Sequence, residues 1–321
     1  MPAFRTIDVG ELSLRVAVEG VGPLVLMVHG FPESWYSWRH QLTPIAEAGF
    51  TAAAIDVRGY GGSDKPHPVP AYAMEHMVAD VAGAIEVLSP GDPAVLIGHD
   101  WGAPIVWNSA LTRPDRVRAV AGLSVPYVGV PTRSMSAMID EVFTRRGRFF
   151  YQHYFQSEGV AEREMQADVR GALRRFYYAI SGDAPDGTWP ADKVVGDTLL
   201  HRLPDPQPFP AWLTPEDLDY YVGEFERSGF RGPINRYRNH DRDFAWLSGF
   251  QGRTIDQPSL FIGGHRDLVL TMFGRVDFIP LMKTQLTDLR GADILPGCGH
   301  WTQQEQPDEV NARLIPWLKS L

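Results

Sequence analysis

One short stretch constrains the fold of this chain more than any other: residues 95–103, which read Val-Leu-Ile-Gly-His-Asp-Trp-Gly-Ala. The apolar start is typical of a buried strand, and the glycines on either side of Asp100 permit a tight turn that side chains would block. Pro104 follows in the first turn of a helix, where its missing N–H costs nothing. The pattern predicts a strand, a sharp turn and a helix, with Asp100 at the tip. The alternative is an ordinary strand–helix turn with a solvated aspartate, because a short motif is a hypothesis until the rest of the sequence supplies its structural context.

A turn of this kind carries the attacking residue in a nucleophile elbow, with Asp100 where esterases have Ser. A free aspartate carboxyl has a pKa of about 3.9, so it is ionised at neutral pH without a base. A serine must first lose its proton. A carboxylate can displace a leaving group at a saturated carbon and form an alkyl ester, which water must then hydrolyse. We therefore expect Asp100 to be a nucleophile.

Strands and helices alternate over the first third of the chain. Alternating or continuous apolar runs predict strands over 12–18, 24–28, 51–57, 94–97 and 118–125. Helical spacing of apolar residues predicts helices over 38–48, 77–88 and from the elbow to about residue 112. This order predicts a mostly parallel sheet with helices on both faces.

The alternation stops after Pro126, and aromatic residues and helical fragments dominate to Gly252. Within this region, residues 181–215 are rich in Pro, Gly and Asp and are expected to form a long connection. Further strands are predicted over 259–262 and 292–295, and a closing helix over 307–321. We therefore expect an α/β core built from residues 1–128 and 253–321, with a helical cap over 129–252 inserted between its two parts.

Composition excludes several classes of protein. The 321 residues are 44% hydrophobic and carry a net charge of −9 without a basic run, so a nucleic-acid partner is not expected. The single cysteine, Cys298, excludes an intrachain disulfide and fits a reducing compartment. The first residues lack the apolar segment of a secretion signal, and no stretch is long enough to span a membrane. We expect a soluble cytoplasmic protein.

Reactive side chains of open α/β sheets gather in loops beyond the carboxyl ends of strands. Asp267 and His300 follow predicted strands, and the chain order nucleophile, acid, histidine is that of the α/β-hydrolases. His300 would be the general base for the water that attacks the ester, with Asp267 orienting it. The alternatives are a helix-capping His300 and an Asp267 that only shapes a turn. The loop after 118–125 has no carboxylate, which favours Asp267.

Backbone N–H groups must stabilise the oxyanion of that second step. The elbow architecture offers the N–H of Trp101, and the earlier loop 29–32 (His-Gly-Phe-Pro) offers that of Phe31. His29 and His99 are expected to be structural, as are the polar residues Asp56, Arg58 and Asp64, and Cys298 is expected to fill the core.

An enzyme that opens a ring by displacing an alkoxide requires an acid opposite the nucleophile, because an alkoxide is too basic to leave unaided. Neutral phenols have a pKa of about 10 and remain protonated at neutral pH. Two segments of the middle region hold tyrosines in distinctive settings: 151–156 (Tyr-Gln-His-Tyr-Phe-Gln) and 230–239 (Phe-Arg-Gly-Pro-Ile-Asn-Arg-Tyr-Arg-Asn). The alternative is that these aromatics only form the core of the lid.

In these segments the sequence resembles the soluble epoxide hydrolases of the α/β-hydrolase superfamily, of the bacterial type without the phosphatase domain of the mammalian relatives. The matching segments span nearly the whole chain in order: 29–40, 56–63, 98–103, 154–156, 230–239, 267 and 299–301. The resemblance implies an α/β-hydrolase fold with a cap and an epoxide substrate. We expect no metal or cofactor, a small-molecule partner only, and a monomer or homodimer. It also implies a cis peptide before Pro32.

The same resemblance implies a role for each site residue. Asp100 is the nucleophile, and His300 with Asp267 activates water. Tyr154 and Tyr237 are the lid phenols that bind and protonate the epoxide oxygen. Phe31 and Trp101 form the oxyanion hole and line the substrate site.

One departure from the epoxide hydrolase pattern is Arg236, which stands where relatives often have Trp beside the second tyrosine.

Other functions share parts of this sequence pattern. A haloalkane dehalogenase shares the Asp elbow but often has Asn where Phe31 stands here, and a fluoroacetate dehalogenase typically has Arg at the position of Trp101. A non-catalytic binding protein of this fold usually loses a triad residue, and none is lost here. The aromatic lid fits lipid, aryl and small alkyl epoxides alike.

Overall fold

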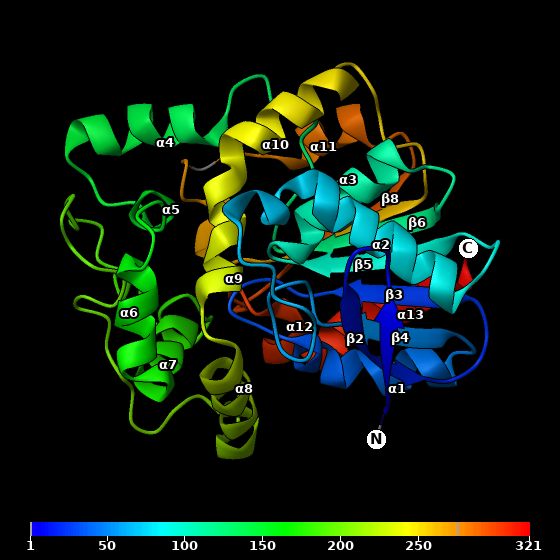
Figure 1. Ribbon diagram of the computed structural model, residues 1–321, viewed down its shortest axis with the longest axis horizontal. Helices are drawn as coiled ribbons and strands as arrows, with labels where there is room; N and C mark the ends of the chain where they lie inside the picture. The colour runs from blue at the N-terminus through cyan, green and yellow to red at the C-terminus, as the bar shows by residue number, and fades with distance from the viewer. Residues whose placement is uncertain (1, 275) are drawn as a thin grey trace.

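The computed structural model describes residues 2–274 and 276–321. At its centre is a sheet of eight strands in the order β1-β2-β4-β3-β5-β6-β7-β8 (Figure 1). The first pairings, β1 with β2 and β2 with β4, are antiparallel, and all others are parallel. The mostly parallel sheet is therefore confirmed. The strands are β1 (Ala3–Asp8), β2 (Ser13–Glu19), β3 (Leu24–Val28), β4 (Thr51–Ile55), β5 (Ala94–His99), β6 (Val117–Leu123), β7 (Ser259–Gly264) and β8 (Leu289–Leu295).

Helices cover both faces of the sheet, as predicted. Residues of β3 alternate between two hydrophobic clusters, because successive side chains of a strand point to opposite faces. Leu26 packs in a cluster with residues of α2 (Met74–Leu88) and α3 (Gly102–Thr112). Met27 packs in the other cluster with residues of α1 (Arg39–Glu47) and α13 (Pro307–Lys319). All five residues of β3 are consequently buried.

The segment between β6 and β7 is helical and, over the described residues, adds no strand to the sheet. Most of its helices lie to one side of the sheet (Figure 1). They are α4 (Met135–Val142), α5 (Tyr151–Tyr154), α6 (Val160–Ala167), α7 (Val169–Ala179), α8 (Pro215–Ser228), α9 (Arg231–Asn235) and α10 (His240–Leu247). Residues 181–214 connect α7 to α8 without a helix or a sheet strand, which confirms the predicted long connection.

Local sequence sets the start of α8. The Thr214 hydroxyl accepts from Asp217 N, and the Asp217 carboxylate accepts from Thr214 N, which together form a capping box. Pro215 occupies the first turn, where it costs no hydrogen bond. The remaining helices are α11 (Ile279–Gln285) and α12 (Thr302–Glu305), and 3₁₀ turns lie at Trp35–Trp38, Val69–Tyr72, Thr144–Arg146, Arg236–Asn239, Ser248–Phe250 and Leu268–Leu270.

Two strands differ from the sequence prediction. Strand β1 was not expected, because Ile7 is its single buried residue and no alternation marks it. Strand β8 begins at Leu289, before the predicted residue 292. Its first residues are not fully buried and form no continuous apolar run, so the sequence pattern does not indicate them as part of a strand. Within the described part of the chain, no helix has the length and apolar character needed to cross a membrane.

Candidate active site

Asp100 lies at the tip of a strained turn between β5 and α3. Its backbone is left-handed, with a φ of 50°, a conformation that costs energy for any residue with a side chain. The neighbouring glycines make the turn possible. A Cβ on Gly98 would collide with the backbone of Gly102, and one on Gly102 would collide with the carbonyl of Val28. The predicted strand–turn–helix is therefore present.

The loop after β3 touches the Asp100 carboxylate directly. Phe31 N donates a hydrogen bond of 2.8 Å to Asp100 Oδ1. Gly30 lies so close that a Cβ there would collide with the same carboxylate. The peptide between Phe31 and Pro32 is cis, as the family resemblance implied. The other expected oxyanion-hole residue, Trp101, is the N-cap residue of α3, and its ring centroid lies 5.2 Å from that of Tyr237.

His300 lies between two carboxylates that come from different strand ends. Its Nε2 is 3.3 Å from Asp100 Oδ2, and its Nδ1 is 3.1 Å from both carboxylate oxygens of Asp267. Asp267 follows β7, and His300 follows β8. Asp267 also accepts from Val269 N, so it shapes a turn as well as holding the imidazole. The structure thus brings all three predicted residues together.

The two carboxylates control the protonation of His300. Burial alone would lower the pKa of this imidazole, because it disfavours the charged form. The negative charge of Asp267, together with the hydrogen bond and charge of Asp100, outweighs burial and raises the pKa of His300 well above its ordinary value. The two carboxylates therefore favour the imidazolium form of His300.

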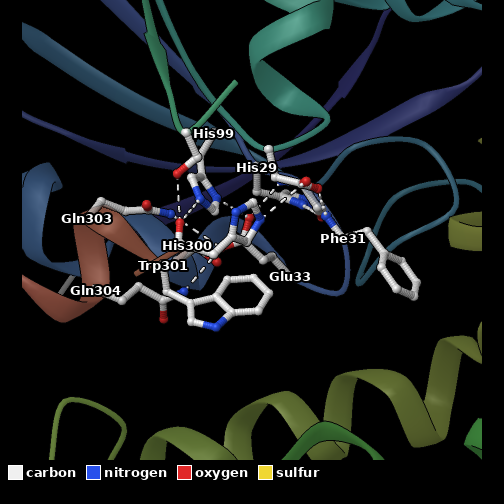
Figure 2. Close-up of polar contacts among 12 residues, drawn as sticks. His29, Phe31, Glu33, His99, His300, Trp301, Gln303 and Gln304 are labelled. Carbon is white, nitrogen blue, oxygen red and sulfur yellow. Dashed lines mark hydrogen bonds and ion pairs between the residues drawn. The ribbon is translucent and has the colours of Figure 1, made fainter. Parts of the chain in front are cut away.

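A buried polar network connects the loops on which this site is built (Figure 2). Glu33 Oε2 accepts from Gly30 N and lies 2.8 Å from His99 Nδ1. His99 Nε2 in turn lies 2.7 Å from the carbonyl oxygen of His300. Glu33 Oε1 accepts from the side-chain amides of Gln303 and Gln304. The network joins the loop that carries Phe31 to the loop that carries His300.

The residues expected to be structural make structural contacts. His29 Nε2 accepts from Val57 N, which leaves Nδ1 to donate to Gly30 O. Asp56 accepts from Trp35 N and Gly62 N. These bonds fix loops at the carboxyl edge of the sheet, and Cys298 is buried in the core.

A cavity of about 270 Å³ opens over Asp100 and His300. Its volume lies just below the range of about 300–1,000 Å³ that is usual for small-molecule sites. Aromatic and aliphatic side chains form most of its wall. The lining residues include Phe31, Tyr151, Phe176, Trp189, Lys193 and Tyr237.

Two phenols share this cavity with the Asp100 carboxylate. The ring centroids of Tyr151 and Tyr237 lie 5.8 Å apart, and the rings are nearly perpendicular. Burial raises the pKa of both hydroxyls above the ordinary value, and the charge of Asp100 raises them further. Both phenols are therefore protonated at neutral pH. Gln152 Nε2 donates to the Tyr151 oxygen, which leaves the Tyr151 proton free for another acceptor.

The structure corrects the expectation for Tyr154. Its hydroxyl donates to Glu164 Oε2 at 2.9 Å, and it does not line the cavity. The Glu164 carboxylate also accepts from Leu199 N and Leu200 N, so it holds Tyr154 in a lid contact away from Asp100. Tyr151, at the start of the same short helix, takes the place predicted for Tyr154. Spacing alone did not separate two tyrosines in one helical turn.

Arg236 lies behind the active site. Its guanidinium carbon is 4.6 Å from the centroid of the Trp101 ring, and it forms an ion pair with Asp243 and a hydrogen bond to Tyr72 O. The side chain is buried and does not line the cavity. The departure from the relatives' Trp therefore changes the support of Trp101 rather than the cavity wall.

Comparisons with known proteins agree with this geometry. A family model described as the alpha/beta hydrolase fold matches residues 23–306. Epoxide hydrolase A of Mycobacterium tuberculosis (strain ATCC 25618 / H37Rv) is 41% identical, over 100% of this chain and 98% of its own. Bifunctional epoxide hydrolase 2 of Rattus norvegicus is 41% identical over 96% of this chain, which spans 54% of that protein.

Solved structures give the same result. An epoxide hydrolase from an endophytic Streptomyces superposes with a TM-score of 0.93 at 47% identity, covering 99% of this chain and 95% of that one. Epoxide Hydrolase A from Mycobacterium thermoresistibile has a TM-score of 0.92 at 40% identity, with 99% and 98% covered.

Proposed function

The chain belongs to the epoxide hydrolases of the α/β-hydrolase fold, and from this membership we propose that it converts an epoxide and water to a vicinal diol through an ester on Asp100. The observation that carries the mechanism is the cavity in which Asp100, His300 and two protonated phenols meet. Asp267 completes the set by holding His300.

In the first step, Asp100 Oδ2 attacks a carbon of the oxirane, while Oδ1 stays on Phe31 N. The carbon–oxygen bond of the ring breaks, and its oxygen takes the proton of Tyr151 or Tyr237. Placing the phenols and the carboxylate in one cavity supports attack from one side and protonation from the other. The product is a hydroxyalkyl ester.

Ester formation prepares His300 for the second step. The ester has lost the negative charge of Asp100, so one of the two carboxylates that raise the pKa of His300 is gone. The imidazolium can then return a proton to the phenolate through solvent and become neutral. Neutral His300, still held by Asp267, is the base that the hydrolysis requires.

In the second step, His300 takes a proton from a water molecule that attacks Cγ of Asp100. The oxyanion that forms is stabilised by Phe31 N–H, and we assign the second donor to Trp101 N–H. Collapse breaks the bond from Cγ to the ester oxygen, and the proton on His300 leaves with the diol. The water oxygen remains on Asp100.

We also propose that residues 129–252 act as a cap over a core of residues 1–128 and 253–321. Asp100, Asp267 and His300 all follow strands of the sheet, whereas Tyr151 and Tyr237 come from the helical segment between β6 and β7. This division separates the nucleophile and base from the acids.

We further propose that the protein is cytoplasmic, which its acidic composition and its single buried cysteine support. We propose that it acts as a monomer or a homodimer.

The rival reaction on the same nucleophile is dehalogenation. Phe31 has an apolar side chain where many haloalkane dehalogenases have Asn to hold the halide, and two phenols serve an epoxide oxygen better than a halide. The experiment is a panel of styrene oxide, stilbene oxide and fatty-acid epoxides scored for diol, with 1-bromoalkanes scored for halide. We expect diol without halide, and the reverse result would overturn the proposal.

A further inference from the structure

A buried lysine lines the same cavity as Asp100, and the mechanism does not use it. Lys193 is 3% exposed, and its ammonium donates 2.8 Å to Leu199 O. Two aromatic rings lie beside the ammonium, with centroids 4.5 Å away for Phe149 and 5.3 Å for Trp189. In residues 2–274 and 276–321, no carboxylate oxygen lies within ion-pair distance of this group. A buried charge without a counter-ion is costly and calls for a functional reason.

The charges around the cavity leave room for an anion. Asp100 is the one carboxylate among the described residues that line it, and His300 already lies against that carboxylate. A second cation, Arg148, also lines the cavity; it is exposed, and its guanidinium carbon lies 5.3 Å from the centroid of the Phe143 ring. The segments that carry the two cations pair through Phe149 N to Lys193 O. The backbone pairing of these two segments therefore holds Arg148 and Lys193 close together along the chain's fold.

An aromatic wall leads from Lys193 toward the nucleophile. The ring centroids of Trp189 and Phe176 lie 6.4 Å apart, and those of Phe176 and Phe31 lie 5.8 Å apart. Trp189 lies beside the ammonium, and Phe31 carries the N–H that bonds Asp100. A substrate along this wall would place an apolar spacer between the oxirane and the cation.

Resting on the proposed function, we infer that the substrate is a compact epoxide that carries an anionic group, such as a carboxylate, across an aryl or similar apolar spacer. Lys193 recognises the anion inside the cavity, and Arg148 adds attraction at its exposed side. The ammonium has donors to spare, because Leu199 O takes one of its three N–H groups. The spacer stacks on the aromatic wall while Asp100 attacks the ring.

The protonation of Lys193 adds a pH signature. Burial lowers the pKa of this ammonium to about 8, against the opposing charges of Glu164 and Asp197 and together with the charge of Arg202. The carboxylate of a substrate stays ionised over the same range. The preference for an anionic substrate should therefore decline as the pH rises through about 8 and Lys193 loses its charge.

The test compares 4-(oxiran-2-yl)benzoate with the neutral isostere 4-(oxiran-2-yl)benzamide. For the unmodified protein at pH 7 we expect kcat/KM to favour the benzoate by about tenfold or more, as a charge-assisted hydrogen bond supports. Lys193→Met should lower this ratio to the about two- to threefold that Arg148 supplies and remove its decline near pH 8, whereas Lys193→Arg should retain most of it. Arg148→Gln should lower the ratio about two- to threefold. Arg146→Gln removes an exposed charge nearby that does not line the cavity, and it should leave the ratio unchanged.

The outcomes separate the two proposals. Equal turnover of both compounds by the unmodified protein, or a ratio that Lys193→Met leaves unchanged, overturns the anion site while the hydrolase proposal stands. No turnover of either compound, nor of the wider epoxide panel, overturns the hydrolase proposal. Calorimetry with the unreactive 4-ethylbenzoate and 4-ethylbenzamide then decides the anion site by itself. Lys193→Gln is a second variant, in case Lys193→Met misfolds. It should reduce the benzoate preference in the same way while its melting temperature stays normal.

Discussion

His99 and Glu33 form a fully buried pair in which imidazole Nδ1 lies 2.8 Å from carboxylate Oε2. The other ring nitrogen of His99 faces the carbonyl oxygen of His300, which can only accept a hydrogen bond, so His99 Nε2 carries a proton. The Glu33 oxygen that faces Nδ1 also accepts from Gly30 N. The pair therefore holds a proton between Nδ1 and Oε2, and it joins the two loops on either side of Asp100.

Removing the charge of Glu33 should destabilise the protein strongly. We expect Glu33→Gln to lower the free energy of unfolding by about 3–5 kcal/mol, because it leaves a buried imidazole facing an amide. Urea unfolding measures this change. The control is Glu309→Gln, which breaks an exposed pair with Arg313 and should cost less than about 1 kcal/mol. Equal effects of the two substitutions would contradict the role of the pair.

The same carboxylate predicts a pH dependence of stability. Burial alone would raise the pKa of Glu33, but His99, His29 and Gly30 N outweigh it and lower the pKa to about 2. The unfolded chain has a pKa of about 4.5 for this group. The stabilising contribution is therefore complete above pH 4.5 and is lost as the pH falls toward 2. Melting temperatures of the unmodified protein and Glu33→Gln should converge over this interval, and parallel curves would contradict the assignment.

Positions set by strand ends were predictable from the sequence, whereas positions set by side-chain packing were not. Asp100, Asp267 and His300 follow strands of a parallel sheet, and topology alone brings such residues to one edge. Tyr151 and Tyr154 share one helical turn, and only Tyr151 lines the cavity. The hydroxyl of Tyr154 instead bonds Glu164, a residue of the next helix, and this contact was not predictable from spacing.

Long-range partners were also beyond the sequence. His99 and Glu33 are 66 residues apart, and no spacing rule joins them. Lys193 lies in a connection without regular structure, where periodicity gives no information about burial. Its environment depends on Phe149 and Trp189, which come from separate loops.

Neutralising Asp100 should change the titration of His300 as well as the activity. Asp100→Asn should lower epoxide turnover by at least about 10⁴-fold, because an amide is a poor nucleophile. It should also lower the pKa of His300, because it removes a charge that raises this pKa and leaves Asp267 alone to do so. Nitrogen-15 NMR of the imidazole follows the titration. Substantial turnover by Asp100→Ala, or an unchanged His300 titration in Asp100→Asn, would contradict the assignment.

Replacing His300 should separate the two halves of the reaction. His300→Gln keeps the Asp100 nucleophile but removes the base that activates water, so the ester should accumulate. Intact-protein mass spectrometry after a single turnover should show an added mass equal to that of the substrate. Peptide mapping should place the added mass on Asp100. Rapid diol release without an adduct would assign the base to another residue.

The two tyrosines of α5 give the sharpest test of the acid. Tyr151→Phe removes one of the two phenols of the cavity and leaves Tyr237 as a proton donor, so it should lower turnover by about 10–10²-fold, at or below the lower end of the usual contribution of a general acid. Tyr154→Phe makes the same chemical change one helical turn away and breaks only the bond to Glu164. It should cost about 1 kcal/mol of stability and less than threefold in turnover. Steady-state kinetics with one epoxide compares the two variants, with the double variant Tyr151→Phe and Tyr237→Phe as the inactive reference. A larger loss in Tyr154→Phe than in Tyr151→Phe would return the acid to Tyr154 and require a different arrangement of the lid during turnover.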